Sequence, residues 1–157
     1  MKSPRWLPLT LFVLLAVGAG AIGAAATGTS VHTWYVGLSK PGWNPPDWIF
    51  APIWTLLYLF MAVATWRVWK TGNPTSARRT VSLYSAQLSL NALWSILFFG
   101  PHRIGAALVD TTALLALLVV VLIRYWRADR TAAAMWIPYV AWVGFATALN
   151  LAIWQLN

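Results

Sequence analysis

The sequence WYVGLSKPGWNPPDW, residues 34–48, joins two long apolar runs of the chain. It holds three tryptophans and three prolines. Proline fixes the backbone angle φ, and tryptophan is a large flat ring with one polar edge. A stiff aromatic connector between two apolar runs therefore predicts a lid at a membrane surface, with a site beneath it.

The uncharged runs on either side of this connector are too long for the core of a soluble protein. The chain is 60% hydrophobic and 9% charged. Uncharged runs cover residues 6–31, 48–66, 80–102 and 131–157, and a fifth, residues 104–123, is interrupted only by Asp110. Each can cross a bilayer as a helix of about 20 residues, whereas the alternating strands of a membrane barrel are not visible.

The sequence thus predicts an all-α membrane protein, a bundle of five transmembrane helices in one domain over residues 1–157. We expect spans at about residues 6–28, 47–67, 79–101, 103–124 and 131–155, with the lid connector at 29–46. The first run has a second interpretation, because its basic start and small residues 18–26 also resemble a signal peptide. The alternative is a helix that packs closely on a neighbour through those small residues.

The eleven basic residues predict the orientation. Two of them, Lys40 and Arg103, fall at the end of the bundle that carries the connector, and the other nine fall at the opposite end. Basic loops stay in the cytoplasm, so we expect a cytoplasmic amino terminus and an external connector. The net charge of +8 is then explained by membrane topology. The sequence shows no basic patch on a soluble surface, so it does not predict nucleic-acid binding. The chain has no cysteine, which excludes thiol chemistry, and its two histidines do not predict a metal site.

The second span has helix-start signals and an aromatic face. Asn44 is placed to cap the helix, Pro45 and Pro46 suit its first turn, and Asp47 is favourable near the positive end of the helix dipole. One face then carries aromatic rings four residues apart, at Phe50, Trp54 and Tyr58. This face either lines a pocket or simply packs against lipid and neighbouring helices.

The third and fifth spans carry polar faces. On the third, small residues (Ser82, Ser85, Ser89, Ala92) lie opposite a second stripe (Tyr84, Gln87, Asn91, Trp94). The small stripe favours close packing within the bundle or across a homodimer, and the amides should face the interior, where they serve a site or bond to other helices.

The fifth span aligns Tyr139, Trp142, Ala146 and Asn150. Trp142 is at mid-span, whereas an interfacial belt is predicted from Trp6, Trp66, Trp69, Trp126 and Trp136. Asp110, the one carboxylate within a span, is either functional or hydrogen-bonded to another helix.

Several ordered blocks resemble the translocator protein family, also called tryptophan-rich sensory proteins or peripheral benzodiazepine receptors. They are the connector itself, PIWTLLY at 52–58, QLSLNALW at 87–94, FFG at 98–100, ALVD at 107–110, and PYVAW at 138–142 with FATALN at 145–150. The resemblance implies a five-helix bundle, commonly a homodimer, that binds porphyrins such as protoporphyrin IX and isoquinoline or benzodiazepine ligands. It places the ligand against Tyr35, Pro45, Trp48, Trp54, Tyr58, Asn91, Trp94, Trp142 and Ala146.

The chain departs from the animal members at its end. Their proposed cholesterol motif has a tyrosine and a basic residue, and the segment LNLAIWQ at 149–155 has neither, so cholesterol recognition is doubtful. The basic tail of those members is also missing after Asn157, which favours a bacterial plasma-membrane protein.

Three classes of function follow from the sequence. We favour a porphyrin-binding sensor or regulator of tetrapyrrole or stress metabolism that needs no cofactor, because no acid, base or nucleophile set is visible. The second class is a light-dependent porphyrin-degrading enzyme, which the resemblance implies for the residues at Trp54 and Trp142. The third is a transporter of porphyrin or another small molecule, although no inverted repeat is visible.

Overall fold

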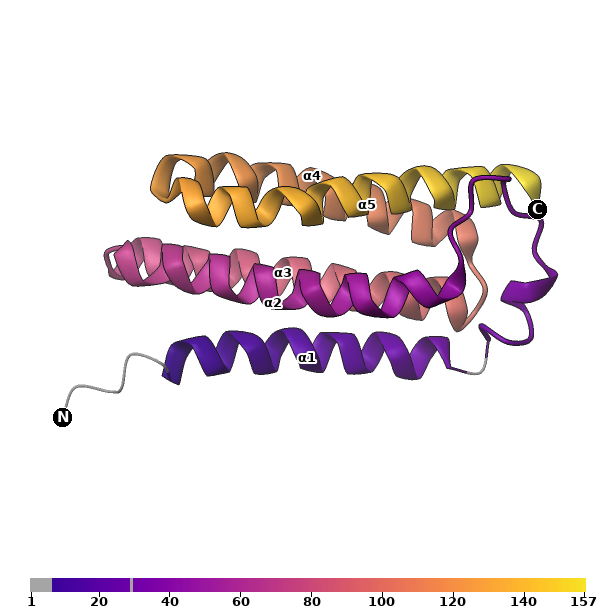
Figure 1. The fold of residues 1–157 in the computed structure, drawn as a ribbon, viewed down its shortest axis with the longest axis horizontal. Helices are drawn as coiled ribbons and strands as arrows, with labels where there is room; N and C mark the ends of the chain where they lie inside the picture. The colour runs from indigo at the N-terminus through magenta and orange to yellow at the C-terminus, as the bar shows by residue number, and fades with distance from the viewer. Residues whose placement is uncertain (1–6, 29) are drawn as a thin grey trace.

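The computed structural model describes residues 7–28 and 30–157, and the regular structure of those residues is helical (Figure 1). Five long helices follow one another: α1 (Leu7–Thr27), α2 (Phe50–Thr71), α3 (Pro74–Phe99), α4 (Ile104–Ala128) and α5 (Arg130–Leu156). Two short 3-10 helices lie between α1 and α2: η1 (Tyr35–Gly37) and η2 (Asp47–Ile49). All five long helices are long and apolar enough to cross a bilayer, which confirms the predicted five-helix membrane bundle.

The helices lie nearly parallel in three layers, with α4 and α5 in one, α2 and α3 in the middle, and α1 in the third (Figure 1). Helix α1 packs on α2 and α3, and α4 packs on α3 and α5. The start of α1 and the α2–α3 and α4–α5 turns lie at one end, which we call the basic end because Lys70, Arg78, Arg79 and Arg127 are there. The connector, the α3–α4 turn and the carboxyl end lie at the opposite, connector end.

The helices at the basic end run further than the uncharged segments of the sequence. Helix α2 continues to Thr71, α3 already begins at Pro74, and α4 continues to Ala128. Arginine and lysine side chains can extend along a helix toward water, so a charge does not end a span. The start of α3 is set instead by its cap, since the Asn73 side chain accepts a hydrogen bond from Ser76 N at 2.8 Å.

The start of the second span differs from the prediction. Helical structure begins at Asp47, and Pro46, with ψ of 140°, is extended and precedes it. A residue before a proline avoids the helical region, which keeps Pro45 outside the first turn as well. The prediction that Asn44 caps this helix is wrong, because its side chain accepts a hydrogen bond from Tyr35 Oη at 3.2 Å and donates one to Pro45 O at 3.0 Å. Asn44 therefore ties together two parts of the connector.

The basic half of the bundle is closely packed. Leu118, Val121, Tyr125 and Tyr139 are buried around Trp136, which is 0% exposed. The assignment of Trp136 to the interfacial belt is therefore wrong, because its ring lies between α4 and α5 and Nε1 donates to Leu118 O at 3.3 Å. Trp6, assigned to the same belt, lies outside the described residues.

Candidate functional site

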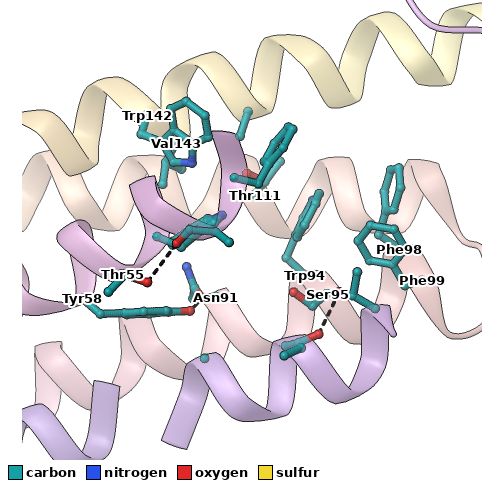
Figure 2. A pocket seen from close by; sticks show the side chains of 18 of the residues that line it. Thr55, Tyr58, Asn91, Trp94, Ser95, Phe98, Phe99, Thr111, Trp142 and Val143 are labelled. Atoms are coloured by element: carbon teal, nitrogen blue, oxygen red, sulfur yellow. Dashed lines mark hydrogen bonds between the residues drawn. The ribbon is translucent and has the colours of Figure 1, made fainter. Parts of the chain in front are cut away.

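A cavity of about 740 Å³ lies in the connector half of the bundle, and all five long helices line it (Figure 2). Its lining residues nearest the basic end are Val13 on α1, Leu59 on α2, Asn91 on α3, Leu114 on α4 and Trp142 on α5. Beyond them, the packed core of the basic half begins. The volume is within the range of about 300–1,000 Å³ that is usual for small-molecule sites.

Aromatic rings form the walls contributed by α2, α3 and α5. The rings of Trp54 and Tyr58 on α2 lie 5.5 Å apart, and those of Trp94 and Phe98 on α3 stack at 5.1 Å. Trp142 on α5 lines the cavity opposite them (Figure 2). These rings offer a flat ligand extensive apolar area and stacking contacts.

The wall contributed by α1 consists of small side chains. Ala16, Gly20, Ala21, Gly23 and Ala24 all line the cavity. A Cβ atom on Gly20 would lie 2.7 Å from Tyr58 Cε2, so a larger residue there would force the Tyr58 ring or α1 to shift. The small run thus serves two purposes, close packing against α2 and space for the cavity.

Two amides and two tyrosines form a hydrogen-bonded chain across three helices. Tyr139 Oη donates to Gln87 Oε1 at 2.8 Å and accepts from Asn91 Nδ2 at 3.2 Å, and Tyr58 Oη donates to Asn91 Oδ1 at 3.0 Å. The sequence left open whether these amides serve a site or bond to other helices. Gln87 is buried and bonds to neighbouring helices, whereas Asn91 does so and also lines the cavity. Both amide atoms of Asn91 are engaged within the protein.

A second polar pair joins α3 and α5. Trp94 Nε1 donates to Asn150 Oδ1 at 2.9 Å, and Asn150 Nδ2 donates to Ile104 O at 3.1 Å. Asn150 lines the cavity although the predicted site omitted it. Its position four residues after Ala146, on the same helix face, was a signal that could have identified it.

Two buried polar side-chain atoms of the described residues have no hydrogen-bond partner, Trp142 Nε1 and Asp110 Oδ2. Trp142 lines the cavity, and its ring nitrogen is turned toward the other lining side chains (Figure 2). Asp110 is 6% exposed and is not among the lining residues. An unpaired buried N–H is costly, and because neighbouring side chains cover Nε1, an acceptor on a ligand would reach it once those side chains shift.

The structure brings together seven of the nine predicted ligand-binding residues. Tyr35, Trp54, Tyr58, Asn91, Trp94, Trp142 and Ala146 line the cavity. It does not bring Pro45 and Trp48 to the lining, and Trp48 is 73% exposed. The apolar lining residues of α1 and α4 were not predicted, because alanine, glycine and leucine in an apolar run carry no sign of what they face.

The connector is fastened to both sides of the cavity's outer end. On one side, Ser30 Oγ donates to Phe99 O at 2.7 Å and the Trp34 ring stacks on His102 at 4.1 Å. On the other side, Asn157 is bonded to Ser39 through Ser39 N to Asn157 Oδ1 and Asn157 Nδ2 to Ser39 O, both at 3.0 Å. Tyr35 reaches from the connector into the lining. The connector therefore covers this end of the cavity, as a lid would.

Comparison with known proteins agrees with this architecture. Residues 12–155 match the model of a family described as the TspO/MBR family. The chain is 40% identical to the Tryptophan-rich protein TspO of Archaeoglobus fulgidus over 96% of this chain and 97% of that protein. It is 38% identical to the Translocator protein of Bos taurus, over 99% and 93%. It is 33% identical to the Tryptophan-rich sensory protein of Cereibacter sphaeroides, over 94% and 91%.

Proposed function

The chain belongs to the TspO/MBR family, and on that premise we propose that it is a membrane receptor for a porphyrin such as protoporphyrin IX. The names of its relatives, translocator and sensory protein, support a role as a membrane sensor or transporter. We assign the ligand to the cavity, and the role to sensing or regulating tetrapyrrole metabolism. Isoquinoline and benzodiazepine ligands, expected from the resemblance, would occupy the same space.

The observation that carries this proposal is the unpaired indole N–H of Trp142 within an aromatic cavity. A porphyrin is flat and largely apolar, so it gains by stacking against Trp54 and Trp142 and by leaving water. Its edge carries carboxylates, which accept hydrogen bonds. The Tyr58 and Asn91 side chains are already bonded to each other, so they shape the wall. The buried, unpaired Trp142 N–H becomes the donor once the side chains that cover it shift.

The shape of the cavity supports binding over passage straight through the bundle. The lining residues stop near mid-bundle, and toward the basic end Leu118, Val121 and Trp136 are buried in a packed core. A ligand in the cavity therefore faces no open path to the basic end. We propose that this end lies in the cytoplasm, because most basic residues are there, and that the protein belongs to a bacterial plasma membrane.

The test is a titration of the purified protein with protoporphyrin IX, in the dark and in light, that follows tryptophan fluorescence and porphyrin absorption. We expect saturable quenching, and weaker binding by about two- to tenfold in Trp142→Phe, because a hydrogen bond contributes about 0.5–1.5 kcal/mol. Trp126→Phe is the matched control, since Trp126 is exposed and is not among the cavity lining. Absence of saturable quenching at micromolar porphyrin would refute the proposal. Porphyrin loss in light that requires Trp54 and Trp142 would establish the enzyme instead.

A further inference from the structure

The exposed part of the cavity lining is confined to one side of the bundle. The lining residues of α3, α4 and α5 are buried or half-buried. Every lining residue that is exposed belongs to α1 and the glycine after it, or to η2 and α2. They include Ala21 and Ala24 on α1 and Ala51 and Thr55 on α2. A residue that both lines a cavity and is exposed marks its mouth, so the mouth lies between α1 and α2.

This mouth faces the bilayer. Both helices that border it are membrane spans, and two of its exposed lining side chains, Val17 and Leu59, are apolar and 55% and 47% exposed. In a membrane-spanning helix such surfaces meet lipid chains. Two polar side chains are among the exposed lining residues: Asp47, at the connector end in η2, and Thr55 within α2. The Thr55 hydroxyl donates to Ala51 O of its own helix at 2.9 Å, so its hydrogen-bonding need is met without water.

The connector covers the water-facing end of the cavity on the α3 and α5 sides, and the exposed lining residues at that end are Gly28 and Asp47. Tyr35 lines this end and is buried, and the connector is bonded to α3 through Ser30 and to the end of α5 through Ser39 and Asn157. A ligand from water that entered between the connector and α3 or α5 would have to break these bonds. A ligand from lipid meets exposed lining residues that include the small side chains of Ala21, Ala24 and Ala51.

We propose that the cavity is loaded sideways from the bilayer, through the gap between α1 and α2. This inference rests on the proposed function for the identity of the ligand, and it adds the ligand's class: an apolar or amphiphilic molecule dissolved in the membrane. Gly20 meets the Tyr58 ring within this gap, and exposed lining residues lie on both sides of the contact: Val17 and Leu59 toward the basic end, and Ala21, Ala24 and Ala51 toward η2.

The test compares a blocked mouth with a fixed lid in nanodiscs. Ala24→Phe puts a large side chain at the mouth, and Ala25→Phe is its control, because Ala25 is exposed on the same helix but does not line the cavity. The lid is fixed by Ser39→Cys with Asn157→Cys and a short thiol cross-linker. These are the only thiols, since the chain has no cysteine. Stopped-flow quenching of tryptophan by protoporphyrin IX gives the rates of binding and release.

We expect Ala24→Phe to slow both binding and release by about tenfold, equivalent to about 1.4 kcal/mol of added barrier, with little change in Kd. Ala25→Phe and the cross-linked lid should keep the parent rates. Loading at the parent rate in Ala24→Phe, together with a large loss of rate in the cross-linked protein, would overturn the inference in favour of access through the lid.

A second measurement needs no porphyrin, so it separates failure of this inference from failure of the proposed ligand. Lipids brominated in their acyl chains quench tryptophans that they contact. In the ligand-free protein, we expect them to quench the share of fluorescence contributed by Trp54, taken as the difference between the parent and Trp54→Phe. Ala24→Phe should reduce that quenching and Ala25→Phe should not. Equal quenching of the Trp54 share in both variants, or none in the parent, would overturn the lateral route.

Discussion

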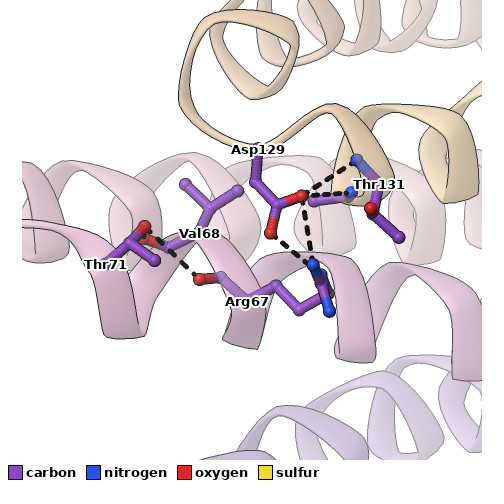
Figure 3. Close-up of polar contacts among 6 residues, drawn as sticks. Arg67, Val68, Thr71, Asp129 and Thr131 are labelled. Carbon is purple, nitrogen blue, oxygen red and sulfur yellow. Dashed lines mark hydrogen bonds and ion pairs between the residues drawn. The ribbon is translucent and has the colours of Figure 1, made fainter.

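Replacement of Asp129 by alanine should measurably destabilise the bundle, because this one side chain fastens three helices at the basic end (Figure 3). It lies between α4 and α5 and accepts hydrogen bonds from Thr131 N at 2.9 Å and Ala132 N at 3.1 Å, which caps α5. It also forms an ion pair with Arg67 of α2, with Nε to Oδ2 at 2.9 Å.

The expected loss of stability has two parts. Removal of an N-cap side chain costs about 1 kcal/mol. The side chains of Arg67 and Asp129 are 33% and 13% exposed, so their pair lies between a surface pair, worth about 0.2–1 kcal/mol, and a buried one. We assign it about 1 kcal/mol, since Arg67 can turn toward water once its partner is gone. Asp129→Ala should thus lose about 2 kcal/mol, or about 4–8 °C in Tm. Asp129→Asn keeps a capping oxygen and should lose about half of that.

The assay is thermal unfolding in detergent, followed by circular dichroism, with Arg127→Gln as an exposed charge control at the same end. Burial works to raise the pKa of Asp129, but hydrogen bonds from Arg67, Ala132 and Thr131 outweigh it and hold the pKa below its usual value. Because this pKa is lower in the folded state, the ionised carboxylate stabilises the fold at pH values above the ordinary carboxyl pKa of about 3.9. That contribution is lost as the pH falls through the lowered pKa. The difference in Tm between the parent and Asp129→Asn should therefore decrease below about pH 4. Equal Tm values for the parent and Asp129→Ala would refute the reasoning.

Three further outcomes are expected. Gly20→Ala should weaken porphyrin binding in the quenching titration, because its methyl would press on the Tyr58 ring, whereas Gly18→Ala, with nothing within 4 Å, should not. Tyr139→Phe should lower stability by about 1–3 kcal/mol in detergent unfolding, since it leaves two buried amide groups unpaired. We propose a homodimer through the exposed serine face of α3, so Ser85→Leu should reduce the dimer fraction in sedimentation, and an unchanged fraction would remove that role.

The five spans were predictable because length and absence of charge are sufficient to identify a membrane helix. Their ends were less predictable, as the extension of α2 past Arg67 shows, because long basic side chains reach water from inside a helix. Trp136 shows a second limit. Its sequence position near a basic loop suggested the interface, and only the packing of α4 against α5 explains why it is buried.

The site was predictable where a residue has both a distinctive type and a periodic position. Trp54, Asn91 and Trp142 were distinguished by type and periodicity, the family resemblance assigned them to the ligand, and the structure brings them to one cavity. Trp48 is also a tryptophan, but it does not line the cavity, because it belongs to the exposed 3-10 turn η2. The α1 wall was not predictable, since an alanine that packs on a helix and one that borders an open space look the same in sequence.

The cavity lies only in the connector half of the bundle, which limits the molecules that can reach it. A lipid bilayer is two leaflets, and a molecule with charged carboxylates crosses slowly from one to the other. A cavity that reaches only half the depth of the membrane samples only one of them. A ligand made on the other side must first cross between leaflets, so occupancy of the cavity reports that crossing as well as the total amount of ligand.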